Sequence, residues 1–408
     1  MVLVTLVLVL AVVRMRRSRS SATAPPAHAG ADASAEGGSL RGPAYTASSA
    51  RLPDAVTRMQ HGDPRRTHRA RGTGPREAKV AWKADVGGPV QGQVVASPDE
   101  KTLYVGSLGG TLTALGRDGR IAWKVDLHGR VYSTPCVGAD GTIYVGSDAR
   151  QFFAVNPAGS IRWKLDTEGD ADTGAALAPN GSIVFASERT VYSVRPSGEV
   201  AWRFRARGKI FTTPAVAEDG TIYVGSQDDR AYALAPNGTV RWSTELGSDV
   251  DGSPALGDDG ALFMGTDGGE VVRLGSKGEI VWRALVGGFV RGPLAIGRDG
   301  DVLAGVYGPS PREVRISAAT GSVLGSMGVQ GTGAREFGVH GGALEDDDGT
   351  LYFGAQDDAA YAVDRQGSLR WRFATGADVD APLTLLGDGS LIVPSDDGIV
   401  YLLAGSAH

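Results

Sequence analysis

Short apolar segments separated by glycine-containing turns fill residues 79–408. A segment such as "IAWKVDL" is followed by a small-residue segment such as "YSTPCVG", by an Asp-Gly or Asn-Gly pair, and then by segments such as "TIYVGS" and "YALAP". Asp-Gly and Asn-Gly favour tight hairpins because the central residues of these turns need positive φ. Segments rich in valine, isoleucine and tyrosine are typical of β-strands. The pattern therefore predicts four short strands in each unit.

The tryptophans give the length of the unit. Six of the seven are 39 to 41 residues apart, and the seventh follows after 89 residues, which corresponds to two units with a few inserted residues. In the unit between them, Gly325 of "VLGSM" stands at the tryptophan position. Eight such units predict an all-β fold, an eight-bladed β-propeller of four-stranded antiparallel blades. We interpret the repeated tryptophans as structural packing residues: Trp82, Trp123, Trp163, Trp202, Trp242, Trp282 and Trp371.

The two ends of the repeat region predict a closed ring. The region opens with a tryptophan segment, "KVAWKADV", and it stops at "GIVYLLAGSAH", where another tryptophan segment is due. We therefore expect the N-terminal strand to complete the last blade. This pairing would remove strand edges that otherwise invite aggregation.

Two segments, "AYALAPNGTVRW" (231–242) and "AYAVDRQGSLRW" (360–371), resemble the repeat of the pyrroloquinoline-quinone (PQQ) family of eight-bladed propellers. The resemblance extends over residues 79–408. It implies one of two functions, because the same repeat builds quinone-dependent alcohol dehydrogenases and the non-catalytic propeller lipoprotein of the outer-membrane β-barrel assembly machinery. It also implies that the repeated tryptophans have a structural role between blades.

Charge and cysteine content narrow the possible classes. Twelve arginines and five acidic residues give residues 1–78 a charge of +7, so residues 79–408 carry −12 of the total of −5. A propeller this acidic is not expected to bind nucleic acid. With Cys136 as the one cysteine, an intramolecular disulfide and a cysteine-rich metal site are excluded. We interpret Cys136 as a small core residue.

The N-terminal residues predict export. Residues 1–13 have the length of a signal-peptide core and are too short to span a bilayer comfortably, although their positive charges follow the apolar run instead of preceding it. Residues 14–78, rich in Ala, Ser, Pro, Gly and Arg, are expected to form a disordered linker. We expect an exported protein of the periplasm or cell envelope, with membrane association through residues 1–13 if at all.

Functional differences between the units are expected at the mouth of the propeller channel. The residue eight positions after each tryptophan position is always apolar, and the residue nine positions after it varies, allowing for six inserted residues in the seventh unit. This alternation indicates a half-buried strand whose variable side chain faces the channel or its rim. We call these the rim positions: Gln91, Tyr132, Asp172, Phe211, Asp251, Arg291, His340 and Asp380.

Three units carry a pair of aspartates here, at 170–172, 249–251 and 378–380. Two carboxylates spaced by two on a strand lie on one face, and together they could bind a hard cation such as Ca²⁺. The alternative is a solvated acidic funnel with Arg130, Lys209 and Arg291 nearby. Since the three units are not adjacent in the ring, we do not expect the pairs to share an ion, and no metal site is predicted.

Two insertions mark a candidate recognition patch. The sixth unit has a longer link, "GVYGPSPREVRI", and the seventh has a longer approach, "GVQGTGAREFGVHGG". In an up-and-down blade these two loops lie on the same face, and loops on a rigid scaffold commonly carry binding residues. The patch is predicted to contain Tyr307, Arg312, Arg335, Glu336 and His340.

The residue types favour binding over catalysis. The adjacent cysteines common in quinoprotein enzymes are impossible here, a Glu–Asn–Asp set for Ca²⁺ is not recognisable, and an acidic rim repels an anionic quinone. We predict no catalytic residues and no cofactor, and a monomeric binding or scaffold propeller with a protein partner. The alternatives are a PQQ- and Ca²⁺-dependent alcohol or sugar dehydrogenase, and a carbohydrate-binding propeller that uses Tyr132, Phe211 and Phe289 as aromatic platforms.

Overall fold

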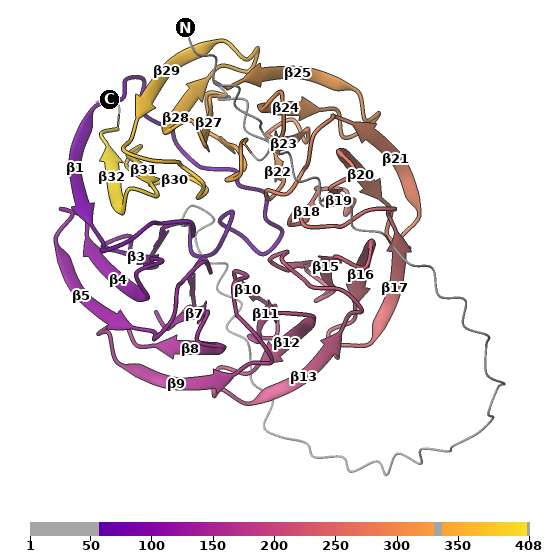
Figure 1. Cartoon of the computed structure of the whole chain (residues 1–408), viewed down its shortest axis with the longest axis horizontal. Coiled ribbons are helices and arrows are strands. Elements are labelled where there is room, and N and C mark those ends of the chain that lie inside the picture. The colour runs from indigo at the N-terminus through magenta and orange to yellow at the C-terminus, as the bar shows by residue number, and fades with distance from the viewer. Residues whose placement is uncertain (1–56, 330–336, 406–408) are drawn as a thin grey trace, which may run out of the picture. The chain divides into compact units, whose positions relative to one another are not determined.

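A computed structural model describes residues 57–329 and 337–405, which form eight four-stranded antiparallel sheets arranged as the blades of a β-propeller (Figure 1). The prediction of an all-β, eight-bladed propeller is confirmed. The described residues contain no helix that is long and apolar enough to cross a membrane.

Each blade has the same order of strands from the channel outwards. The inner strands have two residues each: β2 Val95–Ala96, β6 Cys136–Val137, β10 Ala176–Leu177, β14 Ala215–Val216, β18 Ala255–Leu256, β22 Ala295–Ile296, β26 Leu344–Glu345 and β30 Thr384–Leu385. The second strands are β3 Thr102–Gly106, β7 Ile143–Ser147, β11 Ile183–Ser187, β15 Ile222–Ser226, β19 Leu262–Gly265, β23 Val302–Val306, β27 Leu351–Ala355 and β31 Leu391–Pro394.

The third strands are β4 Thr111–Gly116, β8 Gln151–Val155, β12 Thr190–Val194, β16 Arg230–Leu234, β20 Glu270–Leu274, β24 Arg312–Ile316, β28 Ala359–Val363 and β32 Ile399–Leu403. The outer strands are β1 Val80–Asp85, β5 Ile121–Asp126, β9 Ile161–Asp166, β13 Val200–Arg205, β17 Val240–Glu245, β21 Ile280–Leu285, β25 Val323–Gly328 and β29 Leu369–Ala374. Blades 1 to 7 begin with β2, β6, β10, β14, β18, β22 and β26, and blade 8 consists of β30, β31, β32 and β1.

Ring closure follows the predicted route. β1 pairs antiparallel with β32, with Asp85 opposite Ile399 and Val80 opposite Leu403. The first strand of the repeat region is therefore the outer strand of the last blade, as predicted. No blade is left without its fourth strand.

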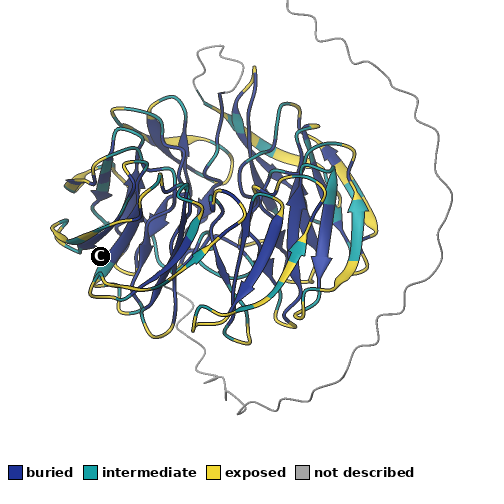
Figure 2. Ribbon diagram, turned by 60° about the horizontal axis from the view of Figure 1, so that its bottom comes forward, coloured by how far each residue is buried: buried dark blue, intermediate teal, exposed yellow. Residues whose placement is uncertain are grey.

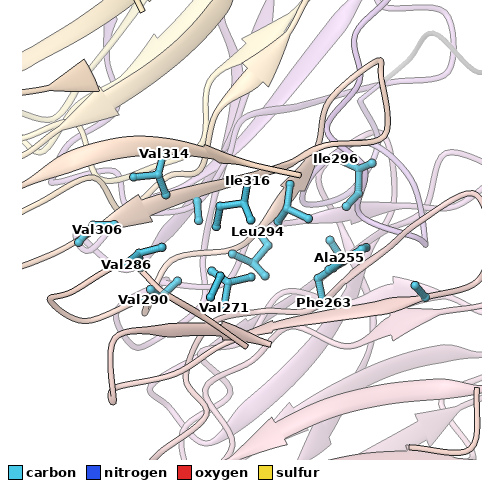
Figure 3. Packing of buried hydrophobic residues seen from close by; sticks show 14 residues of the cluster. Ala255, Phe263, Val271, Val286, Val290, Leu294, Ile296, Val306, Val314 and Ile316 are labelled. Carbon is cyan, nitrogen blue, oxygen red and sulfur yellow. The ribbon is translucent and has the colours of Figure 1, made fainter. Parts of the chain in front are cut away.

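The apolar core lies between neighbouring blades. The second and third strands are buried almost throughout, whereas the outer strands alternate between exposed and half-buried residues (Figure 2). Between blades 5 and 6, Phe263 and Val271 of one sheet pack in the same cluster as Leu294, Ile296 and Val314 of the next (Figure 3). Each blade thus buries its two apolar faces against two neighbours, which is how a sheet that is apolar on both faces is stabilised.

The tryptophans also connect neighbouring blades. Each indole N–H donates a hydrogen bond of 2.8 to 3.0 Å to a backbone carbonyl, and in the first six cases this carbonyl lies in the turn between the third and outer strands of the next blade. The turn needs a glycine, because Gly119 has φ +78° and a Cβ there would lie 2.7 Å from the Trp82 ring. This contact explains why glycine and tryptophan recur together in the repeat.

The junction between blades 7 and 8 uses a substitute for that turn. Blade 8 has no turn between its third and outer strands, since β32 and β1 come from opposite ends of the repeat region. The Trp371 indole donates instead to the carbonyl of Pro75, at 2.9 Å, and Trp371 is buried. The residues that precede β1 therefore supply the missing acceptor.

Residues 57–78 differ from the disordered linker expected over 14–78. They pack against the blades, and the rest of that stretch lies outside the described residues. Their composition is misleading because much of the packing uses backbone carbonyls and the nitrogens of histidine and arginine, so no periodic apolar pattern is needed. We call residues 57–75 the N-terminal strap.

The strap supplies acceptors to the free edges of the inner strands. In five blades, the backbone N–H of the second residue of the inner strand donates to a strap carbonyl, at 2.7 to 3.0 Å. The five acceptors, serving blades 1, 2, 4, 5 and 6 in turn, are Thr57, Arg58, Pro64, Arg65 and Thr67. A buried N–H without an acceptor costs about 1–3 kcal/mol, so the strap stabilises the channel-facing edge of the ring.

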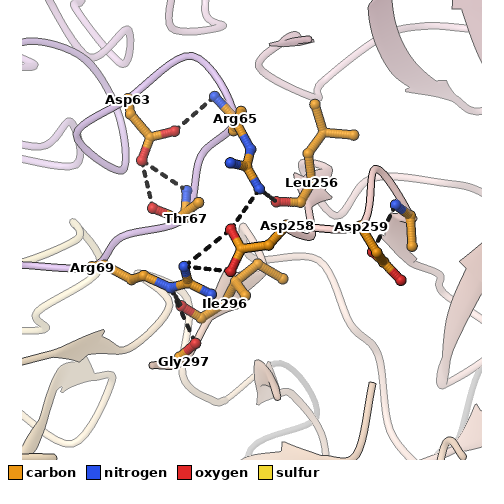
Figure 4. A network of polar contacts seen from close by, with 10 residues as sticks. Asp63, Arg65, Thr67, Arg69, Leu256, Asp258, Asp259, Ile296 and Gly297 are labelled. Atoms are coloured by element: carbon orange, nitrogen blue, oxygen red, sulfur yellow. Dashed lines mark hydrogen bonds and ion pairs between the residues drawn. The ribbon is translucent and has the colours of Figure 1, made fainter. Parts of the chain in front are cut away.

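Polar side chains hold the strap at blades 5 and 6. Arg65 and Arg69 reach the two carboxylate oxygens of Asp258, at 2.8 and 2.9 Å, and Arg69 also donates to the carbonyls of Ile296 and Gly297 (Figure 4). Asp63 accepts hydrogen bonds from within the strap itself and fixes its turn. Since Asp258 is exposed, these pairs position the strap more than they stabilise it.

Two stacked histidines connect the strap to blades 6, 7 and 8. The rings of His61 and His68 are 4.0 Å apart and both are buried. The ring nitrogens of His61 face the carbonyls of Leu294 and Gly341, at 3.0 and 3.2 Å, and those of His68 face carbonyls of blades 7 and 8. Burial lowers the pKa of His68 to about 4 and that of His61 well below its usual value, so both rings are neutral at physiological pH.

We expect a chain that begins at Glu77 to be much less stable than one that begins at Thr57. It keeps β1 but loses the strap, including buried Met59, and loss of one such side chain alone costs about 2–5 kcal/mol. Urea denaturation of the two chains measures the difference in free energy of unfolding. Equal denaturation midpoints would show that the strap does not support the ring.

Candidate functional site

The rim positions lie where the chain enters each inner strand, at the mouth of the channel opposite the turns that hold the strap. The eight side chains differ widely in exposure: Asp380 is 8% exposed, six are half-buried, and Phe211 is 44% exposed. Phe211 is therefore the most exposed of them. Several of the others contact the preceding blade.

A second set of variable residues supplies the partners, and of these the sequence analysis had singled out only Tyr307. These residues lie in the turn between the second and third strands, next to a serine, threonine, alanine or valine. The residue of one blade faces the rim position of the next. The set is Leu108, Asp148, Glu188, Gln227, Asp267, Tyr307, Gln356 and Asp396.

Polar pairs of these two sets cross the junctions of blades 8 and 1, 4 and 5, and 5 and 6. Gln91 donates to Asp396 at 2.7 Å, and Gln227 donates to Asp251 at 3.1 Å. The Arg291 guanidinium contacts the Asp267 carboxylate through two nitrogens, at 3.0 and 2.8 Å. The variable rim residues thus form specific contacts between blades.

An acidic cluster occupies the junction of blades 2 and 3. Carboxylate oxygens of Asp148, Asp170 and Asp172 lie within 4.8 Å of one another. Burial, followed by the hydrogen bond and charge of Asp148 and the charges of Asp170 and Glu188, raises the pKa of Asp172 to about 8. Asp172 therefore keeps its proton at neutral pH, and this proton reduces the repulsion within the cluster.

This cluster adjoins a small cavity beside Phe211. The cavity has a volume of about 50 Å³, and its lining includes Asp172, Glu188, Lys209 and Phe211. The three clustered carboxylates could hold a cation, but they offer fewer oxygens than the six to eight that Ca²⁺ takes. A retained proton gives the same charge balance without an ion.

The other two aspartate pairs are also shifted. Burial raises the pKa of Asp251, Asp378 and Asp380 to about 6 each, and in the first two cases neighbouring carboxylates add to the shift. Asp396 beside them has a pKa raised to about 7. The rim at blades 5 and 8 therefore changes its charge between pH 5 and 8.

The cations near the rim are paired with acids. Arg130 contacts Asp148 at 3.0 Å and Lys209 contacts Glu188 at 3.2 Å. Arg291, besides its contact with Asp267, has its guanidinium 4.4 Å from the centre of the Phe289 ring. The side chains of Arg130 and Arg291 thus serve contacts within the protein.

The predicted recognition patch is only partly accessible. Tyr307 is buried and its backbone pairs with Phe289 and Gly338, while the Arg312 guanidinium donates to the carbonyls of Val286 and Ser310. His340 is half-buried, with its ring against Tyr307 at 5.6 Å between centroids. Burial, together with a nearby arginine, lowers the pKa of His340 to about 4. The other two residues of the patch, Arg335 and Glu336, lie outside the described residues.

The chain matches one known protein family. The family model described as outer membrane protein assembly factor BamB matches residues 67–192, 153–236 and 227–304. A search of curated proteins found no match.

Three solved structures resemble the fold. BamB from Moraxella catarrhalis is 16% identical, with a TM-score of 0.65 over 79% of this chain and 98% of that one. A europium-containing methanol dehydrogenase is 12% identical, with a TM-score of 0.69 over 84% and 89%. A quinohemoprotein alcohol dehydrogenase from Comamonas testosteroni is 13% identical, with a TM-score of 0.70 over 88% and 82%. At these identities the likeness extends to the fold alone.

We expect Asp172→Asn to stabilise the protein at pH 8 and to have the least effect near pH 4. The folded state keeps the Asp172 proton up to about pH 8, whereas an unfolded aspartate releases it near pH ~4, so stability falls as pH rises between these values. The amide does not titrate and can donate to Asp148, which should raise the free energy of unfolding by about 1–3 kcal/mol at pH 8.

Denaturation of the full chain at pH 4 and pH 8 measures this effect. Asp170→Asn is the comparison variant: Asp170 belongs to the same cluster but is exposed, so its replacement should stabilise the protein at pH 8 in the same direction but by less. A difference between Asp172→Asn and the unchanged protein that is the same at both pH values would contradict the account of the cluster.

Proposed function

The chain belongs to the family described as outer membrane protein assembly factor BamB, and from that premise we propose that it is a non-catalytic binding or scaffold propeller of the cell envelope whose partner is a protein. The proposal draws on the family match and on the rim. A rigid ring with different residues at equivalent positions suits selective recognition of another protein.

The exposure of Phe211 supports this proposal most directly. Phe211 is 44% exposed at the edge of the cavity that Asp172, Glu188 and Lys209 also line. A large aromatic side chain in solvent beside charged groups has the composition of an interface hot spot. Burial of the ring by a partner would remove this apolar surface from water.

The quinone-dependent alternative has less support from the rim. PQQ is an anion, and the rim cations Arg130, Lys209 and Arg291 are each paired with an acid, Arg130 within its own blade and the other two across a blade junction. The residues present therefore fit an anionic quinone poorly. The carbohydrate-binding alternative needs open aromatic faces, and Arg291 covers that of Phe289.

We expect Phe211→Ala to weaken capture of the partner by the full chain by about tenfold or more, since loss of a central aromatic side chain typically costs 2 kcal/mol or more. The measurement is a quantitative pull-down from cell-envelope extract, with bound proteins identified by mass spectrometry. Leu285→Ala is the matched control, because Leu285 is 73% exposed on outer strand β21.

Equal capture by Phe211→Ala and the unchanged chain would argue against the rim as the binding surface. Saturable binding of PQQ in the presence of Ca²⁺, together with alcohol- or sugar-dependent reduction of a dye, would favour the enzyme instead.

A further inference from the structure

Five blades place an aromatic side chain at one position of the second strand. In each of them this residue pairs across the sheet with the third strand, and that partner pairs with the tryptophan of the outer strand. The aromatic ring lies 5.8 to 5.9 Å from the tryptophan ring of its own blade and packs in the cluster that joins the next blade. The five residues are Tyr104, Tyr144, Tyr223, Phe263 and Tyr352.

Blade 3 lacks this ring. Val184 stands at the same register position, since it pairs with Ser193, which pairs with Trp202. A cavity of about 120 Å³ opens beside it at the junction with blade 4, lined mainly by apolar atoms of Val184, Ile222 and Pro236. We call it the blade 3–4 pocket.

The other two blades without an aromatic ring have larger side chains here. Leu303 of blade 6 pairs with Arg315, whose buried guanidinium contacts Glu345 at 2.8 Å. Ile392 of blade 8 pairs with Leu402. Valine is thus the smallest residue at this position, and it lies next to the pocket.

The neighbouring residue indicates which ring would fit. Wherever the aromatic residue is tyrosine, the residue two positions earlier is threonine, and where it is Phe263 that residue is Ala261. Burial raises the pKa of Tyr144 to about 12, and a hydrogen bond between its phenol and Thr142 opposes this shift. Blade 3 has Ser182 two positions before Val184, so it retains the hydroxyl although it lacks the tyrosine.

We propose that the blade 3–4 pocket binds the phenol ring of a tyrosine side chain presented by a protein partner. The ring would take the space that the tyrosines of other blades fill, with its hydroxyl beside Ser182. That the partner is a protein rests on the proposed function. That the ligand is a phenol ring is inferred from the tyrosines that stand at the same position in other blades.

The size and lining of the pocket suit this ligand. An apolar cavity of roughly 150 Å³ in another protein takes up benzene, so about 120 Å³ with an open mouth is enough for one aromatic ring. Asn180 and Glu218 at the edge are polar and can meet the backbone of the peptide that carries the tyrosine.

The pocket lies on the face of the propeller away from the rim. It is lined by the turns at Ala178–Asn180 and Glu218–Gly220, which join first to second strands, and by Pro236 in a turn from third to outer strand. The rim is built from the opposite loops. β11 and β15 belong to the two adjacent blades (Figure 1), and each contributes a residue, Val184 and Ile222, to the lining of the pocket. A tyrosine here would be a second contact, separate from Phe211.

The test measures binding of p-cresol, the side-chain analogue of tyrosine, and of toluene, the analogue of phenylalanine, to the full chain by NMR titration. We expect saturable binding of p-cresol, tighter than that of toluene. Val184→Tyr should weaken it by at least about tenfold, because the new ring fills the pocket. Ser182→Ala should remove the preference for p-cresol and leave toluene binding unchanged.

Tyr223→Val is a matched gain-of-site variant. It gives blade 4 the residue that blade 3 has, next to Thr221, and should add a second binding site for p-cresol at the junction with blade 5. If Val184→Tyr fails to fold, Tyr223→Val and Ser182→Ala still test whether the pocket binds a phenol ring.

Absence of p-cresol binding, or binding that Val184→Tyr does not change in a folded protein, would overturn the proposal. Partner capture that survives Val184→Tyr unchanged would also overturn it, because the pocket would then not serve the partner. The p-cresol measurement needs no partner, so a failure of the proposed function at Phe211 is distinguishable from a failure here.

Discussion

The structure depends on the contact between each tryptophan and the turn of the following blade. The indole N–H reaches a backbone carbonyl, and a glycine in the same turn leaves room for the ring. Such a contact stabilises a blade only through its neighbour, so the ring is complete only when the last blade is docked as well. That requirement explains the two functions of the N-terminal part, where β1 provides a strand and Pro75 provides an acceptor.

The repeated tryptophan contact holds the ring together, whereas the residues that differ between blades at the rim are available for specific recognition. The contact pairs a tryptophan with a glycine-containing turn at six junctions and Trp371 with Pro75 at a seventh, while the rim positions and the turn residues that face them vary. Because the variable residues pair across junctions, as Gln91 does with Asp396, they are held in fixed positions on the ring. The exposed Phe211 is the contact proposed for a partner, and a missing ring at Val184 leaves a pocket on the other face.

The propeller fold could be predicted from the sequence because the same pattern of strands and turns recurs in eight units. Tryptophan spacing, Asp-Gly turns and the segment at Val80 predicted the number of blades and the closing strand. The strap was missed because its contacts use backbone carbonyls and buried His61 and His68, which leave no periodic apolar pattern. The rim positions were predicted, but the turn residues that face them from the preceding blade were not. Which residues meet across a junction depends on how two blades pack, and the sequence pattern of a single blade does not reveal this. Valine at 184 was visible in the sequence, although the pocket beside it was not.

The central claim is that β1 closes the ring on β32, and a disulfide across that pair tests it most directly. Asp85 and Ile399 are register partners, so Asp85→Cys with Ile399→Cys should form an intramolecular disulfide under mild oxidation, detected by mass spectrometry of peptides. The native Cys136 is buried, and burial raises its pKa to about 12, so it should not compete. The account predicts rapid cross-linking of this pair and little cross-linking of the out-of-register pair Asp85→Cys with Tyr401→Cys. Failure of the in-register pair to cross-link, or disulfides formed only between molecules, would contradict a closed ring.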